Sequence, residues 1–295
     1  MNENPTWLLD FRSNVYSQSG EDGVIEKILE VIDTLDGWCV EFGALDGQRM
    51  SNTRNLIQNR KYSAVLIEGN KKFFRSLQNN YSDNQNVITL NKLVGFNRED
   101  SLDTILADTS IPKNYDFLSI DIDGNDYHVW NAAQVYRPKI VCIEFNPTIP
   151  TEVEFVQDAD MNVSQGSSLK SLVKLAKKKC YQLVCVVGVN AFFVSDEYFS
   201  LFKIQNNDIH ILRTDTSKVT YLFTGYDGKV FIRGYGKMPW HLRLPMKESR
   251  MQRIPWILRN FPGNYNLPEL LIFGFYLLIT SPVILFSELR KRLVK

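Results

Sequence analysis

The sequence of 295 residues contains few cysteines and histidines, four and three respectively. The cysteines Cys39, Cys142, Cys180 and Cys185 include no CxxC pair and no spacing typical of a metal finger. Each lies in an apolar or strand-like run. We therefore predict free, buried thiols.

The N-terminus lacks a basic segment followed by an apolar one, so the sequence predicts no signal peptide and a reducing, cytoplasmic location. Internal repeats and low-complexity tracts are also absent. With 44% hydrophobic and 23% charged residues, the composition is that of an ordered globular protein.

Neither sign of charge is in clear excess, because the formal net charge is only +1. The distribution is nevertheless uneven: ten basic and three acidic residues lie from Lys237 onward, which gives this tail a charge of +7 and the preceding residues −6. Such asymmetry is typical of a chain whose basic end meets a polyanionic partner or an acidic surface.

Short apolar runs alternate with segments of helical spacing along most of the chain. The predicted strands are 38–42, 63–67, 87–90, 117–120, 140–145, 183–187 and 191–194, and the first helix is expected to begin at Ser19 with Asp22 as a capping partner. The pattern predicts a Rossmann-like α/β sheet of about seven mostly parallel strands with helices on both faces. Because no helix separates the last two strands, we expect an antiparallel pair there.

Three regions follow from these patterns. Residues 1–196 form the α/β domain, including a long connection at 146–166 of the kind that is often functional or mobile. Residues 197–236 form an appendage with a β-hairpin, whose strands 219–223 and 229–233 flank a glycine-containing turn. Residues 237–295 form a basic, apolar tail.

Two acidic residues mark the ends of the first two predicted strands. Glu41 precedes the turn Gly43-Ala44-Leu45-Asp46-Gly47, whose glycines let the backbone approach a ligand closely. Glu68 ends the next strand, where an acid in nucleotide-type sites accepts both ribose hydroxyls. The pair indicates an adenosine-containing ligand, and the departure from GxGxxG favours one without phosphates. The alternative for the first motif is a tight turn that merely needs glycine.

A third polar group follows the fourth predicted strand, in the segment Ser119-Ile120-Asp121-Ile122-Asp123-Gly124-Asn125-Asp126-Tyr127-His128. Two catalytic roles compete. Asp121 and Asp123 would share a divalent cation such as Mg²⁺, or one of them would take a proton from an acceptor hydroxyl with His128 nearby. The alternatives are that residues 123–126 form only a turn and helix N-cap, and that His128 is a structural histidine.

Four motifs in order, over about residues 14–195, resemble the FkbM-type family of S-adenosylmethionine-dependent methyltransferases. They are Tyr16-Ser17-Gln18-Ser19-Gly20-Glu21-Asp22-Gly23, Glu41-Phe42-Gly43-Ala44 with Asp46-Gly47, Ile67-Glu68-Gly69-Asn70, and Asp121-Ile122-Asp123-Gly124-Asn125-Asp126.

The resemblance implies a class I methyltransferase sheet that binds S-adenosyl-L-methionine and methylates a hydroxyl of a sugar, polyketide or related metabolite. It implies that Glu41, Gly43 and Gly47 form the methionine side of the pocket, with Asp46 in the same turn. Glu68 would bind the ribose, and Gln18 would close the pocket. An Asp-x-Asp-Gly-Asn-Asp segment replaces the commoner Asp-x-Glu-Gly type after the fourth strand, which leaves the base and the need for a metal open.

The tail holds an uncharged run of 17 residues, 270–286, that is bracketed by positive charge. A straight helix of this length is about 25 Å long, short of the hydrocarbon core of about 30 Å, so it is a minimal span, a re-entrant segment or a buried helix. The basic residues interleaved with apolar ones before it favour a membrane surface. The basic residues after the run are Arg290, Lys291, Arg292 and Lys295. A helix buried in a dimer is the alternative, and nucleic acid is not an expected partner.

These patterns together predict an S-adenosylmethionine-dependent O-methyltransferase at the cytoplasmic face of a membrane, acting on a sugar, a lipid-linked glycan or a related hydroxyl acceptor. Two other functions stay open: a catalytically inactive, membrane-bound binding or scaffold protein with this fold, and a metal-dependent enzyme of different chemistry centred on Asp121 and Asp123. The sequence leaves the oligomeric state open.

Overall fold

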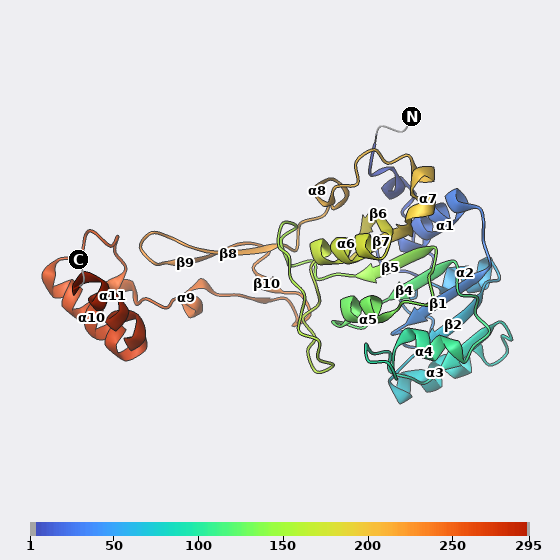
Figure 1. The fold of residues 1–295 in the computed structure, drawn as a ribbon, viewed down its shortest axis with the longest axis horizontal. Helices are drawn as coiled ribbons and strands as arrows, with labels where there is room; N and C mark the ends of the chain where they lie inside the picture. The colour runs from blue at the N-terminus through green and yellow to red at the C-terminus, as the bar shows by residue number, and fades with distance from the viewer. Residues whose placement is uncertain (1–3, 294–295) are drawn as a thin grey trace. The chain divides into compact units, whose positions relative to one another are not determined.

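A computed structural model of the chain describes residues 4–293 and divides it into two compact units, Met1–Thr216 and Ser217–Lys295 (Figure 1). The first unit contains the predicted sheet together with all the predicted site residues. The second contains the predicted hairpin and the apolar helices of the tail.

The first unit is built on a seven-stranded sheet in the order β3-β2-β1-β4-β5-β7-β6. Its strands are β1 (Trp38–Phe42), β2 (Ser63–Ile67), β3 (Val87–Leu90), β4 (Phe117–Ile120), β5 (Ile140–Glu144), β6 (Tyr181–Val187) and β7 (Asn190–Ser195). Only β7 runs antiparallel, and it pairs with both β5 and β6. The predicted Rossmann-like sheet of seven mostly parallel strands is therefore confirmed, including the antiparallel pair.

Helices cover both faces of this sheet (Figure 1). One face packs on α1 (Glu21–Ile32), α2 (Arg54–Asn59) and α3 (Lys71–Tyr81), and the other on α4 (Leu102–Ala107), α5 (Asp126–Ala132) and α6 (Leu169–Lys178). Successive side chains of a strand point to opposite faces, so Cys39 joins the first core while its neighbour Val40 joins the second. Because both faces are buried, the strands are almost continuously apolar.

Shorter elements complete the first unit: η1 (Trp7–Phe11), α7 (Asp196–Phe199), η2 (Ser200–Phe202) and α8 (Ile209–Leu212). The compact unit thus continues through residues 197–216, which the sequence pattern groups with the appendage. The long connection 146–166 contains no helix or strand.

In the second unit, β8 (Thr220–Thr224) and β9 (Val230–Gly234) form the predicted antiparallel hairpin. After the hairpin come β10 (Lys237–Met238) and β11 (Leu244–Pro245), which pair with each other. They are followed by α9 (Glu248–Met251) and η3 (Trp256–Leu258). The apolar run is divided between two helices, α10 (Leu267–Thr280) and α11 (Pro282–Leu293), because Pro282 cannot continue the backbone hydrogen-bond ladder. Within residues 4–293, no helix meets the length and apolarity that crossing a membrane requires. The predicted charge at Lys295 lies outside the described residues.

Two local predictions are wrong. Ser19 and Asp22 do not form a capping pair: α1 is preceded by Gly20 at φ +103°, and the Asp22 carboxylate turns back to accept the amides of Val15, Tyr16 and Ser17. Of the four cysteines, Cys180 is exposed, since it follows the end of α6 in a left-handed turn with φ +60°.

A buried ion pair ties the amino ends of the strands together. The ammonium of Lys139 donates to Asp116 at 2.8 Å, to Asp36 at 2.7 Å and to the carbonyl of Thr34 at 2.6 Å. Asp116 is fully buried and also accepts the amides of Asp36 and Gly37. The pair therefore joins the loop before β1 to the starts of β4 and β5.

We predict that Lys139→Met lowers the free energy of unfolding by about 3 kcal/mol, because it leaves the Asp116 charge buried without its cation. Urea denaturation followed by circular dichroism measures this. Lys174→Met is the matched control, since Lys174 pairs with Glu154 on the exposed surface, and it should leave the stability nearly unchanged. Equal effects of the two substitutions would contradict the role of the buried pair.

Candidate functional site

The strand order reverses between β1 and β4, because β2 and β3 continue on one side of β1 and β5 on the other side of β4. In open α/β sheets, ligands bind outside the carboxyl ends of the strands at such a switch point. The predicted site residues of β1, β2 and β4 all follow or end these strands. They converge on this edge of the sheet.

The turn after β1 lies against the end of β4. Gly43 has φ +73°, and a Cβ at this position would be 1.9 Å from the carbonyl oxygen of Asp121. Gly47 has φ +68°, and its Cβ would be 2.6 Å from side-chain atoms of Leu77 and Tyr81. Both glycines are required by space and by their left-handed backbone, so the turn needs glycine whether or not it binds a ligand.

Glu41 lies at the end of β1 and is 5% exposed. Its carboxylate accepts the hydroxyls of Ser51 and Thr53 at 2.6 and 2.7 Å and the amide of Asn52 at 2.8 Å. Burial raises the pKa of this carboxyl, and the same three donors lower it in part. In the structure, Glu41 holds the loop that precedes α2.

Glu68, at the end of β2, binds both the turn after β1 and the residues that follow β2. One of its oxygens accepts the amide of Leu45 at 2.8 Å, and the other accepts the amide of Asn70 at 2.6 Å. Each carboxylate oxygen has two acceptor positions, so each retains one for a further donor. This buried carboxylate therefore suits a ligand with two adjacent hydroxyl groups.

Asp46 shapes the same turn locally. Its carboxylate accepts the amides of Gln48 and Arg49 and pairs with the Arg49 side chain at 2.7 Å. Desolvation opposes ionisation, yet these hydrogen bonds and the arginine charge hold the pKa of Asp46 below its usual range. Asp46 thus stays a carboxylate that stabilises the turn.

Gln18 lies on the segment before α1 and is exposed. The segment is held by the Asp22 carboxylate and by Asn14, whose side chain donates to the Gln18 carbonyl at 3.0 Å. Tyr16 adds a hydroxyl bond to Gln58 at 2.8 Å, and the Arg54 guanidinium lies 4.1 Å from its ring centre. The N-terminal motif is therefore fastened to α2, which follows the loop held by Glu41.

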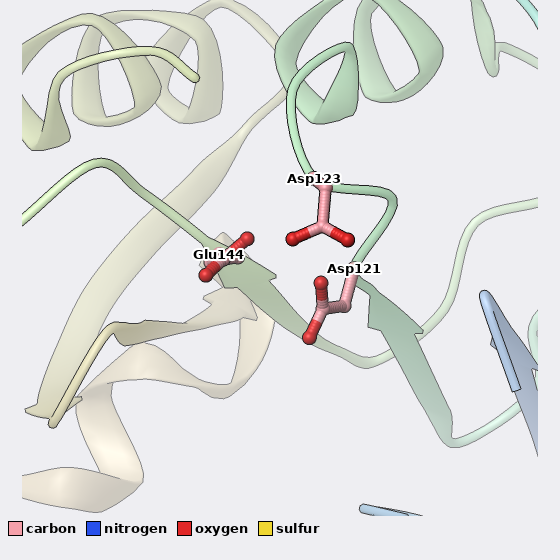
Figure 2. A group of neighbouring side chains, drawn as sticks. All are labelled: Asp121, Asp123 and Glu144. Atoms are coloured by element: carbon pink, nitrogen blue, oxygen red, sulfur yellow. The ribbon is translucent and has the colours of Figure 1, made fainter. Parts of the chain in front are cut away.

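Three carboxylates meet beyond β4 and β5. Asp121 and Asp123 follow β4, Glu144 ends β5, and one oxygen of each lies within 4.8 Å of the others. Figure 2 shows the side chains of Asp121 and Asp123 directed toward the same space as that of Glu144. Three hard oxygen ligands at this separation suit a divalent cation such as Mg²⁺.

The electrostatics of this cluster favour a bound positive charge or a shared proton. Although part of Asp121 is accessible to solvent, loss of hydration raises its pKa, and the nearby charges of Asp126 and Asp123 raise it further. Burial raises the pKa of Glu144, and the charges of Asp121, Asp126 and Asp123 raise it further. Within the described part of the chain, no backbone amide or hydroxyl donates to these three side chains, in contrast to Glu41 and Glu68.

Asp126 has a different environment, although it lies nearby in sequence. Its two oxygens accept the amides of Ile122 and Gly124, each at 2.9 Å. Burial raises the pKa of Asp126 to about 6 against the effect of these bonds. The bonds stabilise the turn in which Asp123 takes a left-handed conformation with φ +56°, so Asp126 supports the turn that presents Asp123.

His128 faces the long connection 146–166. Its Nε2 lies 2.8 Å from the carbonyl oxygen of Gln157, so this nitrogen is the donor, and its ring packs near Phe96 and Tyr127. Gln157 is buried and organises the connection by accepting the amides of Gln165 and Gly166. No described contact joins His128 to the three carboxylates.

Glu144 is the site residue that sequence reasoning missed. The pattern extended the fifth strand to Phe145, which made Glu144 an interior strand position. In the parallel pairing of β4 with β5, Ile120 is level with Ile143, so the next residues, Asp121 and Glu144, are adjacent at the carboxyl edge. The available signal was an acidic residue at the end of an otherwise apolar strand.

No family model matches the chain, and neither does any curated protein. Solved structures with a similar fold include the N-terminal domain of EvdMO1 with SAH bound, which is 11% identical over 61% of this chain and 80% of that one, with a TM-score of 0.38. A SAM-dependent methyltransferase from Aquifex aeolicus is 12% identical over 65% of this chain and 96% of that one, with a TM-score of 0.37. At these values the resemblance to the FkbM-type family stays a prediction, and function has to be inferred from the site's own residues.

We predict that, in the presence of a chelator, Asp121→Asn becomes more stable relative to the wild type as the pH rises from about 5 to about 8. The raised pKa means that ionisation of Asp121 is penalised in the fold, so the wild type loses stability as the pH rises through that pKa, whereas asparagine stays neutral. Urea denaturation across this range measures the difference. Asp158→Asn, in an exposed loop position, is the control. A pH-independent difference for Asp121→Asn would contradict the electrostatic account.

Proposed function

We propose that this protein is an S-adenosylmethionine-dependent methyltransferase that methylates a hydroxyl oxygen. The observation that carries the proposal is the position of the turn 43–47 between two acidic groups. Leu45 donates to Glu68 on one side, and Gly43 lies against Asp121 on the other. A ligand at this turn would therefore reach from Glu68 to the carboxylates beyond β4 and β5.

The cofactor would be held on the β1 and β2 side. Glu68 has one acceptor position left on each oxygen, which suits the two ribose hydroxyls of an adenosine. The turn Gly43-Ala44-Leu45-Asp46-Gly47 follows a strand and contains no basic residue, which is consistent with a phosphate-free ligand. Gln18 would close the pocket from the N-terminal segment, as the resemblance implies.

When bound, S-adenosylmethionine supplies an activated methyl group on its sulfonium. The protein then has to align the acceptor hydroxyl and accept its proton. The carboxylate cluster would accept the hydroxyl proton as the methyl group passes from sulfur to the acceptor oxygen, with S-adenosylhomocysteine as the other product. Without a bound cation, the raised pKa makes Asp121 a better proton acceptor near neutral pH than an ordinary aspartate; a cation would lower this pKa, and the cluster would then act by orienting the acceptor oxygen.

A divalent cation would be held by Asp121, Asp123 and Glu144. It would offset the repulsion between the three carboxylates and orient the acceptor oxygen. His128 would act indirectly, because its bond to Gln157 positions the connection 146–166 beside the site. This set of ligands is the predicted pair Asp121 and Asp123 with Glu144 added.

The acceptor is proposed to be a sugar or lipid-linked glycan at the cytoplasmic face of a membrane. Support comes from the second unit, which combines exposed apolar helices with a net positive charge.

A metal-dependent enzyme of different chemistry is a second candidate, favoured by the three-carboxylate cluster itself. The other function that the sequence leaves open is a binding protein without catalysis. Such a protein would bind the cofactor but would transfer no labelled methyl group from it.

We predict that Glu68→Gln weakens S-adenosylmethionine binding by at least about tenfold, because an amide NH₂ replaces one of the two acceptors that the ribose hydroxyls need. Isothermal titration calorimetry measures the affinity, and circular dichroism checks the fold. Glu99→Gln, at an exposed position, is the control. Unchanged affinity of the Glu68 variant would rule out this cofactor site.

We predict that Glu144→Gln weakens Mn²⁺ or Mg²⁺ binding by about tenfold, since one of three charged ligands is lost, while S-adenosylmethionine still binds. Calorimetry with each ligand separates the two effects. Methyl transfer from labelled cofactor to a membrane extract should fall on chelation and recover when Mg²⁺ is added. Full activity with chelator present would contradict the cation; chelator-sensitive chemistry without cofactor binding would favour the second candidate.

A further inference from the structure

The two C-terminal helices present a broad apolar surface. They contact one another across the break at Ser281 and Pro282. On α10, the inner side carries Phe273, Tyr276 and Leu277, with the ring of Phe273 stacked on Tyr265 at 5.4 Å. The opposite side is exposed and carries Leu267, Leu270, Leu271, Ile272, Phe275, Leu278 and Ile279. On α11, Val283, Ile284, Phe286 and Leu289 are exposed as well.

A positively charged side chain lies at the break between these helices. Arg253 donates through Nη2 to the Ser281 hydroxyl at 3.0 Å and to the Thr280 carbonyl at 3.4 Å. The Tyr276 hydroxyl donates to the carbonyl of Arg253. The segment that contains Arg253 and η3 therefore lies along the inner side of α10, opposite its exposed apolar face.

Further basic residues lie on the segment before η3 and on α11. Arg243, Lys247 and Arg250 are exposed on the segment before η3, and Arg290 and Lys291 are exposed near the end of α11. Long basic side chains place their charge at the phosphate level while their stems lie on apolar surface. Exposed apolar helices in a unit that also exposes basic side chains match the chemistry of an anionic lipid surface.

We infer that α10 and α11 lie in the plane of an anionic lipid surface, with the apolar side of α10 in the acyl boundary and Arg253 at the phosphates. This inference rests on the membrane part of the proposed function and decides its geometry. A re-entrant hairpin with the break at its tip would carry Arg253 into hydrocarbon, where a charge is costly. The in-plane orientation keeps the break and its arginine at the headgroups.

Flotation of the full-length protein with vesicles tests the surface. We expect binding to vesicles of equimolar phosphatidylglycerol and phosphatidylcholine and weak binding to phosphatidylcholine alone, because the basic residues need anionic lipid. Phe275→Asp should lower the partition coefficient by about tenfold, since an aromatic ring that enters the lipid is replaced by a charge. Leu222→Asp, the same kind of change at an exposed position of β8, should not.

Thiol labelling of vesicle-bound protein tests the orientation. The chain suits this experiment because Cys180 is its only exposed cysteine among the described residues, so a Cys180→Ser background leaves the other three buried. In that background, Thr280→Cys at the break should react with a membrane-impermeant maleimide as fast on vesicles as in solution. Phe275→Cys should react at least about tenfold more slowly on vesicles.

The outcomes separate the two levels of the proposal. Absence of flotation with either vesicle would overturn the membrane part of the proposed function, while cofactor binding is measured independently. Flotation in which the thiol of the Thr280→Cys variant is protected would overturn the in-plane orientation alone and indicate a re-entrant tip. Flotation in which the Phe275→Cys variant still reacts at its solution rate would also overturn it, because the apolar face would then lie outside the lipid.

Discussion

The backbone of Gly43 lies against the carbonyl of Asp121, and no side chain fits between them. This contact joins the turn after β1 to the end of β4 at the point where the strand order reverses. Through the amide of Leu45, the same turn is bound to Glu68 at the end of β2. One close approach thus connects three strand ends into a single site, and any larger residue at position 43 would separate them.

Acidic side chains along this edge fall into two groups with different partners. Glu41, Glu68 and Asp126 are buried and accept hydrogen bonds from amides or hydroxyls of the chain, so they organise loops, and Glu68 keeps one acceptor position on each oxygen. Asp121 and Glu144, in contrast, have mainly other carboxylates as neighbours, and repulsion adds to the loss of hydration in raising their pKa. The fold stabilises the first group internally and leaves the second to a proton, a cation or a substrate hydroxyl.

The two units differ in where their apolar side chains lie. In the sheet domain, apolar residues are buried between strands and helices, whereas α10 and α11 leave most of theirs exposed. Exposed apolar surface of this extent usually marks an interaction site. The position of Arg253 at the break is what favours a surface orientation for these helices.

The sequence by itself determined the sheet, because strands buried on both faces appear as apolar runs separated by helical spacing, and it determined the hairpin through its turn residues. It also identified Asp121 and Asp123, since polar residues that follow a buried strand lie at the ligand edge. Only the tertiary structure decided that Glu144 joins them, because its position depends on the pairing register of β4 and β5. The tertiary structure also decided two sets of hydrogen-bond partners. Asp22 binds the preceding segment instead of capping with Ser19, because that segment folds back over the start of α1, and His128 contacts Gln157, 29 residues away, because packing brings the long connection to it.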